Sequence, residues 1–454
     1  MSRRERLDVV VVGAGVVGAT AALALARDGL QVALVEAREP PRWRAGPADA
    51  DPADTTPADS HRADPDQADP DQADSDHADS DHADSNPANA APLESTPDDL
   101  RVYAFAPDNA ALLDDLGVWG GVRDARLQPY RAMRVWDAAG GGEIVFNADA
   151  FGRRELGWIV EHALLVDRLW AALPAAGVQL LCPERVVALA QEEGDGDAAL
   201  ELASGRRLRA RLVVAADGAD SQVRRLVGID ASVHDYGQSG VVAFVDSERP
   251  HQATCWQRFL PSGPLAFLPF KGSGVGAAGR EGHRSSIVWT LPEAEAARLL
   301  QADDASFLRE LAAAFAGTLG TLSLASKRAA FPLRRQLAQA HVAGRVALVG
   351  DAAHVVHPLA GQGVNLGLRD VAALRALLRA VTARQGDIGS PARLSRWARE
   401  RRSENALAAH AFDGFNRLFS NDALAATLLR GPLLGLAGRL PPLTHALWRR
   451  AAGL

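Results

Sequence analysis

Cysteine is scarce in this chain, which has only Cys182 and Cys255 among its 454 residues. Two cysteines cannot build a framework of disulfide bridges, and neither has cysteine or histidine neighbours at the spacing of a metal site. This usage fits a reducing cytoplasm, with both residues serving in packing. The apolar share of 47% and the charged share of 23% are those of an ordinary soluble protein of two or three domains and exclude a fibre.

Charge is missing from one long stretch, Val9 to Ala26, which has 18 residues without an ionisable side chain. A run of this length after several arginines could be a signal peptide or a membrane span. Gly13, Gly15 and Gly18 within it have instead the spacing of a turn between a strand and a helix. A buried parallel strand followed by a buried helix produces the same apolar pattern, so we expect a soluble chain.

Large apolar side chains are almost absent from the segment 47–97, which repeats five-residue units such as Ala-Asp-Pro-Asp-Gln from Ala63. Ordering it would cost conformational entropy with nothing to bury, so we expect a disordered acidic insertion. Its thirteen aspartates and Glu94 face only Arg62, which leaves a charge of −13 here and +6 on the rest of the chain. The positive net charge of the chain outside this segment suits phosphate-bearing cofactors or an anionic membrane surface. We predict no metal site, because no ligand set in the repeat is fixed in space.

The first glycine-rich segment predicts a βαβ unit. Gly13 allows a tight bend, Gly15 lets a pyrophosphate approach backbone N–H groups, and Gly18 lets the helix pack closely on the strand. The helix N-terminus also favours phosphate, and Glu36 is placed to accept hydrogen bonds from a ribose. Such a unit serves FAD and NAD alike. The elements expected around it are a strand, a helix and a second strand over Asp8–Val12, Val16–Asp28 and Gln31–Glu36.

A second segment follows the predicted buried strand Leu212–Ala216. Asp217 and Gly218 form its turn, and Ser221 can cap the helix that starts there. Alone, this segment is equally well explained as a capped helix.

The third segment is more specific. The predicted strand Val346–Gly350 delivers Asp351 into a loop, where a carboxylate can hold a polyol hydroxyl. Glycines further on let a second helix, Val364–Arg379, direct its N-terminus at the other end of the cofactor. Three separated segments thus agree on one flavin cofactor. The residues of the third segment that carry this inference are Gly350, Asp351, Pro358, Gly361, Gln362, Gly363 and Asn365.

The pattern resembles the group A flavoprotein hydroxylases of the para-hydroxybenzoate hydroxylase fold, and most closely the ubiquinone-biosynthesis hydroxylases of the UbiH/UbiF/VisC type. The resemblance covers nearly everything outside 47–97. Further motifs that carry it are Asp99-Leu100-Arg101-Val102, Leu116-Gly117-Val118-Trp119, Met133-Arg134-Val135-Trp136-Asp137, Leu156-Gly157-Trp158-Ile159-Val160-Glu161 and Leu418-Phe419-Ser420-Asn421.

The resemblance implies which residues bind FAD. The first glycine turn would bind the pyrophosphate, Glu36 the adenosine ribose and Asp351 the ribityl chain. Arg101 would lie along the cofactor, and the Asp217-Gly218 turn would serve both FAD and the nicotinamide donor. No catalytic side chain is assigned. The implied cofactor-binding residues are Gly13, Gly15, Gly18, Glu36, Arg101, Asp217, Gly218, Gly350, Asp351, Pro358, Gly361, Gln362, Gly363 and Asn365, of which Gly361, Gln362 and Gly363 would lie near the flavin ring.

The resemblance also implies a reaction. Hydride from NAD(P)H would reduce FAD, O2 would form a flavin C4a-hydroperoxide, and a polyprenyl phenol of ubiquinone biosynthesis would be hydroxylated on its ring. Two alternatives stay open: a flavin-dependent reductase or dehydrogenase, and a non-catalytic FAD-holding subunit of a ubiquinone-synthesis complex. Expected partners are the phenol substrate, such a complex and a membrane surface, but no nucleic acid. The expected location is the cytoplasm, with peripheral contact at the inner membrane as a further option.

Two features depart from the family pattern. Relatives usually join the equivalents of Glu36 and Arg101 by a short loop, but a loop insertion costs little closure entropy, so the pocket should survive it. His162 stands where many relatives have asparagine, and its role stays open. His354 and His357 could suggest a metal or a base. Without a third ligand, packing against the cofactor is the better interpretation.

We therefore predict an α/β chain (α+β overall) with a Rossmann-like FAD-binding domain, a β-sheet substrate domain and a helical C-terminus. The C-terminal region mixes arginine with leucine and tryptophan, which suits a closing helical layer or docking on a membrane. The predicted division is 1–46, 98–127, 150–230 and 330–380 for the FAD-binding domain, 47–97 for the insertion, 128–149 and 231–329 for the substrate domain, and 381–454 for the helical region.

Overall fold

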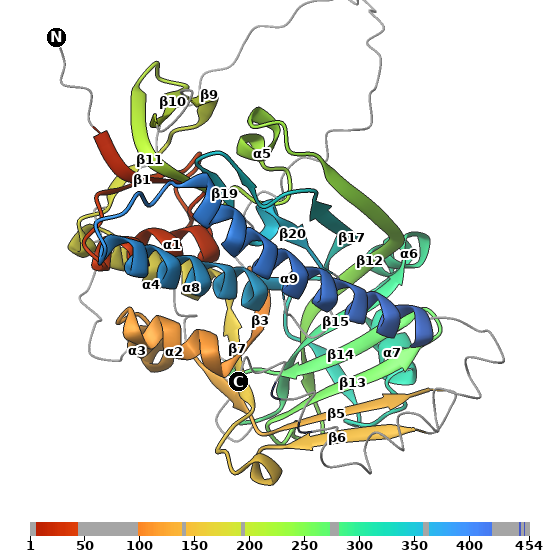
Figure 1. Ribbon diagram of the computed structural model, residues 1–454. Coiled ribbons are helices and arrows are strands. Elements are labelled where there is room, and N and C mark those ends of the chain that lie inside the picture. Colours follow the sequence, from red (N-terminus) through yellow and green to blue (C-terminus); the bar gives the residue numbers. More distant parts are fainter. Residues whose placement is uncertain are drawn as a thin grey trace, which may run out of the picture.

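The computed structural model describes residues 6–43, 99–138, 142–191, 196–272, 281–356 and 363–419, together with His445 and Arg449. The predicted insertion 47–97 lies outside the described residues. Within them, strands form three sheets with helices packed around them, as Figure 1 shows. The mixed α/β fold expected from the sequence is confirmed.

The first sheet has a parallel centre in the order β19-β11-β1-β2-β8. Its central strands are buried on both faces, which explains their runs of valine, leucine and alanine. Antiparallel β18 and the β9–β10 hairpin extend it. Its strands are β1 (Arg6–Val12), β2 (Val32–Val35), β8 (Gln179–Leu181), β9 (Val186–Gln191), β10 (Ala198–Leu202), β11 (Arg207–Ala215), β18 (Val342–Ala343) and β19 (Val346–Leu348).

Helices α1, α4 and α8 pack together with this sheet in one continuous apolar core. Helix α9 follows α8 and, in Figure 1, runs from beside α8 across to the second sheet. The described residues contain no helix that is both long and apolar enough to span a bilayer. The α-helices outside the second sheet are α1 (Val16–Arg27), α2 (Pro107–Asp115), α3 (Trp119–Ala125), α4 (His162–Ala172), α5 (Gln222–Leu226), α8 (Gly363–Thr382) and α9 (Pro391–Phe419).

The second sheet has the order β20-β17-β12-β15-β14-β13-β5-β6, with β16 also paired to β12. Helices α6 (Glu293–Gln301) and α7 (Asp304–Ala314) bury their apolar faces against it. Strand β17 straddles the proposed domain boundary at residue 330. The strands are β5 (Ala132–Asp137), β6 (Glu143–Asn147), β12 (Ala231–Ser247), β13 (Thr254–Leu260), β14 (Gly263–Pro269), β15 (Arg284–Pro292), β16 (Leu322–Leu324), β17 (Ala329–Ala338) and β20 (His354–Val355).

A third, small sheet has the order β3-β7-β4. Its residues share an apolar cluster with residues of the second sheet, among them Ile159, Ala266 and Phe270. The small sheet therefore joins the cofactor side of the fold to the large antiparallel sheet. Its strands are β3 (Val102–Phe105), β4 (Gln128–Tyr130) and β7 (Gly157–Glu161).

Candidate cofactor site

Four neighbouring strands of the first sheet end at the same edge. The pairing of Val12 with Val35 and with Ala215, and of Ala215 with Leu348, aligns the carboxyl ends of β2, β1, β11 and β19. Ligands of open parallel sheets bind at this edge. The residues that follow the four ends, in spatial order, are Glu36, Gly13, Asp217 and Asp351, so the fold brings the three sequence segments together.

The turn after β1 is built around glycine. Gly13 has φ +94°, and a Cβ there would overlap the backbone of Ala216. A Cβ on Gly18 would overlap the carbonyl of Gly13 in the same way. Around Gly15, by contrast, a Cβ would meet no atom within 4 Å, and no side chain caps helix α1 there. Two glycines thus serve close packing, and the third leaves an open approach to uncapped N–H groups.

Glu36 holds this turn from the neighbouring strand end. Its Oε2 accepts a hydrogen bond from the backbone N–H of Ala14 at 2.6 Å, and Oε1 accepts one from the N–H of Arg38 at 3.1 Å. From the other side, the indole Nε1 of Trp170 on α4 donates to the carbonyl of Ala14 at 2.8 Å. The contribution of Trp170 was not predicted, because nothing in the local sequence ties it to a turn 156 positions away.

The Asp217 carboxylate is used within its own turn. Its Oδ1 accepts from the Ser221 hydroxyl at 2.5 Å and Oδ2 from the N–H of Val223 at 3.0 Å. Ser221 Oγ accepts from the N–H of Arg224 at 2.9 Å, which confirms the predicted cap of the short helix α5. Gly218 takes φ +81°, a conformation that favours glycine. The side chain of Asp217 therefore shapes the turn beside the glycine loop.

Asp351 lies in a 3₁₀ turn, Gly350–Ala352, directly after β19. Gly350 has φ +58° and packs against Val17 of α1. The side chain of Asp351 is accessible to solvent, while Ala352 and Ala353 are buried. Although the residue is exposed, the protein around the Asp351 carboxyl desolvates it in part and raises its pKa above its ordinary value. The turn thus presents one carboxylate at the shared edge of the sheet.

Only part of the segment after Asp351 falls within the described residues. Pro358, Gly361 and Gln362 lie outside them, and so does His357, whereas Gly363 is the first residue of α8. The buried Asn365 uses its amide within the protein: Oδ1 accepts from the N–H of Ala106 at 3.0 Å, and Nδ2 donates to the carbonyl of Ala104 at 2.8 Å. Its side chain joins the start of α8 to β3.

A cluster of polar side chains lies at the start of β3. Arg101 is paired with Asp99, with its Nε 2.9 Å from Oδ1, and 60% of its side chain is exposed. Tyr103 Oη lies 2.8 Å from Nδ1 of His162. Burial raises the pKa of Tyr103, and the charges of Arg101 and Asp351 both act on it. Arg101, predicted to lie along the cofactor, is thus paired with Asp99 at an exposed position at the start of β3.

His162, whose role the sequence left open, faces this group. Burial and the positive charge of Arg101 lower its pKa to about 4. It is consequently neutral near pH 7, so the Tyr103–His162 contact is a hydrogen bond between two neutral groups.

His354 is a buried residue with a carboxylate partner. Its Nε2 lies 2.6 Å from Oδ2 of Asp370, and its side chain is fully buried. Across the described part of the chain, no three histidine, cysteine or acidic residues are grouped so that they could hold a metal ion. The structure thus gives His354 a structural partner.

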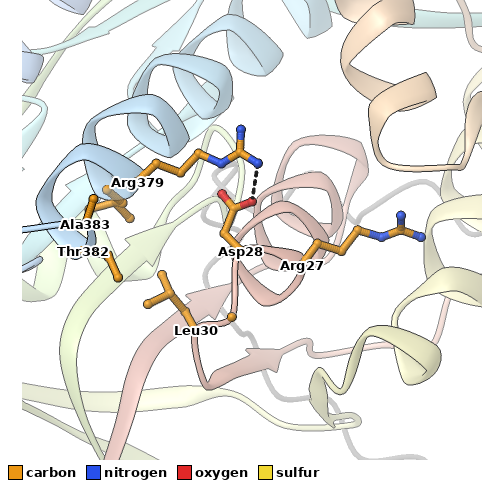
Figure 2. A pocket seen from close by; sticks show the side chains of 8 residues that line it. Arg27, Asp28, Leu30, Arg379, Thr382 and Ala383 are labelled. Carbon is orange, nitrogen blue, oxygen red and sulfur yellow. Dashed lines mark ion pairs between the residues drawn. The ribbon is translucent and has the colours of Figure 1, made fainter.

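A surface groove of about 400 Å³ lies between the ends of α1 and α8, as Figure 2 shows. Its acidic residue, Asp28, is paired with Arg379 at 3.0 Å and with Arg375 at 2.9 Å. Helix α1 begins at the cofactor edge of the sheet and ends at the opposite edge. The groove beside Asp28 is therefore separate from the four strand ends, and we assign it no part in the site.

Two family models match the chain. The model described as FAD binding domain matches residues 112–410, and the model described as FAD dependent oxidoreductase matches residues 8–49. Ubiquinone hydroxylase UbiL of Rhodospirillum rubrum is 34% identical over 98% of this chain and 89% of its own length. This chain belongs to the family of FAD-dependent ubiquinone-biosynthesis hydroxylases. A second relative in the family, 3-demethoxyubiquinol 3-hydroxylase of Escherichia coli, is 33% identical over 98% of each chain.

Solved structures show the same fold. The p-nitrophenol 4-monooxygenase PnpA of Pseudomonas putida superposes with a TM-score of 0.67 at 18% identity, covering 99% of each chain. The probable FAD-dependent monooxygenase PqsL of Pseudomonas aeruginosa gives 0.65 at 21% identity and covers 96% of this chain and 100% of its own. The resemblance stated from the sequence motifs is thereby confirmed for the family and for the fold.

Proposed function

We propose that this family member is an FAD-dependent monooxygenase that hydroxylates the aromatic ring of a polyprenyl phenol intermediate in ubiquinone biosynthesis. The observation that carries the proposal is the meeting of Glu36, the Gly13 turn, Asp217 and Asp351 at one edge of a parallel sheet. The names of the two relatives described above support the substrate class.

The residues of this edge fit FAD. The open approach at Gly15 and the uncapped start of α1 suit a pyrophosphate. Glu36, two strands away from Asp217, would bind the adenosine ribose, and Asp351 would bind the ribityl chain. Asn365 would fix the position of the N-terminal end of α8 relative to β3. Gly363, the first residue of that helix, is proposed to lie near the flavin ring with Gly361 and Gln362. Bound FAD, reduced by NAD(P)H, supplies the activation of O2.

The protein would supply orientation and exclusion of water. Apolar residues of the small sheet and of the second sheet pack together beside β3, among them Ala104, Ile159 and Phe270. We propose that the aromatic ring and the isoprenoid tail of the substrate bind beside this apolar cluster. Tyr103, bonded to the neutral His162, would place a polar group at the border of that cluster.

Contact with a membrane surface at the inner membrane, from a cytoplasmic position, is part of the proposal. Its support is α9, whose exposed side between Arg393 and Arg402 also carries Arg396 and Arg399, interspersed with Glu400. A basic helix surface suits an anionic bilayer that holds a lipid-tailed substrate. Membership of a ubiquinone-synthesis complex is a further proposal that rests on the family resemblance alone.

A turnover experiment tests the function. The FAD-loaded protein is incubated with a short-chain prenylphenol, NADPH and ¹⁸O₂, and products are analysed by mass spectrometry. We expect a hydroxylated phenol that contains one labelled oxygen. Oxidation of NADPH without a hydroxylated product would instead identify a reductase, and a protein that retains FAD without oxidising NADPH in the presence of the phenol would be a non-catalytic subunit.

A further inference from the structure

A buried hydrogen-bond network connects helix α9 with the turn that carries Asp351. Its centre is Asp370 on α8, which is 1% exposed. Oδ2 of Asp370 accepts from the backbone N–H of Gly350 at 3.1 Å and lies 2.6 Å from Nε2 of His354. Gly350 and His354 stand on either side of Asp351 in the chain. One carboxylate oxygen therefore holds the chain on both sides of Asp351.

The other oxygen of Asp370 is bound from α9. Nε of Arg401 donates to Oδ1 at 2.8 Å, and Nδ2 of Asn405 donates to the same oxygen at 3.1 Å. Burial works to raise the pKa of Asp370, but His354 and Arg401 hold it well below its ordinary value. Asp370 is consequently ionised and accepts all four contacts.

The composition of this helix face is unusual for packing alone. Leu394 and Trp397 begin the buried face of α9, and a buried stripe ordinarily continues with apolar residues. Arg401 and Asn405 occupy those positions instead, although they are only 5% and 1% exposed. An ion pair in such a place offers little net stability, because desolvation offsets the attraction. Orienting a neighbouring group is therefore the better explanation.

We propose that Arg401 and Asn405 are positioning residues for FAD: by fixing Asp370, they hold the Gly350–Ala352 turn in the conformation in which Asp351 binds the cofactor. The inference rests on the proposed role of Asp351. Helix α9 contacts β18 of the first sheet and β14 of the second, and its course across the molecule is visible in Figure 1. Cofactor retention is thereby coupled to the seating of α9 on both sheets.

The test compares the affinity for FAD with the stability of the apoprotein in matched variants. Arg401→Met and Asn405→Ala remove donors to Asp370. Arg401→Lys keeps a charge without the planar fork and should restore part of the affinity. Arg375→Met is the control, because Arg375 is also buried at 8% and ion-paired on α8, but contacts Asp28 and Asp115 at the opposite edge of the sheet.

The dissociation constant for FAD is measured by flavin fluorescence and the apoprotein Tm by calorimetry. We expect Arg401→Met to raise the dissociation constant about tenfold or more and Asn405→Ala about threefold. Arg375→Met should lower the apoprotein Tm and leave the dissociation constant for FAD within about twofold of the wild-type value. A change of that size is smaller than the loss of a hydrogen bond would cause. If Arg401→Met does not fold, the dissociation constant of Asn405→Ala for FAD tests the proposal by itself.

Two outcomes separate this inference from the proposed site. If Asp351→Ala binds FAD normally in the same titration, the site assignment itself is wrong. If Asp351→Ala loses FAD while Arg401→Met and Asn405→Ala bind it with wild-type affinity and only lower the Tm, the site stands and the positioning role is refuted.

Discussion

Arg224 donates a hydrogen bond from Nη1 to the carbonyl oxygen of Ala352 at 2.9 Å, across 128 positions of the chain. Its Nη2 donates to the carbonyl of Ala219 at 2.9 Å. One buried guanidinium therefore ties the turn after β11 to the turn after β19. The two loops that carry Asp217 and Asp351 are held in register by a residue that belongs to neither turn.

Arg224→Met should weaken both the fold and FAD binding. The substitution leaves the buried carbonyl oxygen of Ala352 without its donor, whereas the carbonyl of Ala219 still accepts a hydrogen bond from Nε2 of Gln336 at 2.6 Å. We expect this loss to lower the free energy of unfolding by about 1–3 kcal/mol. Urea denaturation and flavin titration measure the two effects. Arg225→Met, at the exposed neighbouring position, is the control. Equal behaviour of the two variants would show that the bridge between the turns is unimportant.

Gly15→Ala should separate cofactor binding from folding. Gly15 has φ −66°, which alanine adopts readily, and an added Cβ meets no atom of the protein within 4 Å. We expect apoprotein stability to be unchanged or slightly raised, while FAD affinity falls because the methyl group stands where the pyrophosphate approaches. Gly120→Ala, in helix α3 with similar free space, should leave FAD affinity unchanged. Wild-type affinity in Gly15→Ala would argue against the pyrophosphate assignment.

Asp351→Ala should fold and yet purify without yellow colour. Loss of a charged hydrogen-bond partner of the ribityl chain is expected to cost about 1.5–3 kcal/mol of binding free energy, roughly ten- to hundredfold in affinity. The ratio of visible to ultraviolet absorbance of the purified protein reports the flavin content. Circular dichroism checks that the variant is folded.

Histidine burial predicts an acid-sensitive fold. Burial lowers the pKa of His341, which is 4% exposed, from 6.5 to about 4. Below pH 6.5 this histidine becomes protonated in the unfolded chain, whereas in the folded chain it stays neutral until about pH 4. The free energy of unfolding therefore falls as the pH drops through this window. The contribution of His341 to the free energy of unfolding is at most about 3.5 kcal/mol. Urea denaturation at several pH values should show a shallower loss for His341→Gln than for wild type. An identical pH dependence would contradict the prediction.

Replacing residues 47–97 by a Gly/Ser linker of about ten residues should leave the flavin content unchanged. The repeat has almost nothing to bury, and loop length contributes little to closure entropy. Flavin content and Tm of the purified variant provide the measurement. Loss of FAD on replacement would give the acidic repeat a structural role.

The sequence by itself determined where the strands end in turns to within two residues, because local chemistry decides this. The strands expected to end at Ala216 and Gly350 end at Ala215 and Leu348. Gly13 and Gly18 lie where a side chain would overlap backbone, and Ser221 caps the helix that follows its turn, as the local pattern indicates. The apolar strands that precede Asp217 and Asp351 were likewise readable, since strands buried on both faces need continuous apolar runs.

Only the tertiary structure decided how these turns are held together. Arg224 donates a hydrogen bond to the carbonyl of Ala352. Asp370 accepts hydrogen bonds from both Gly350 and Arg401. Asn365 joins α8 to β3. None of these partners is close in sequence, and arginine or asparagine on a helix is ordinarily a surface residue. A long-range hydrogen bond leaves no periodic signal in a sequence, because its geometry exists only after the sheet has brought its strand ends to one edge.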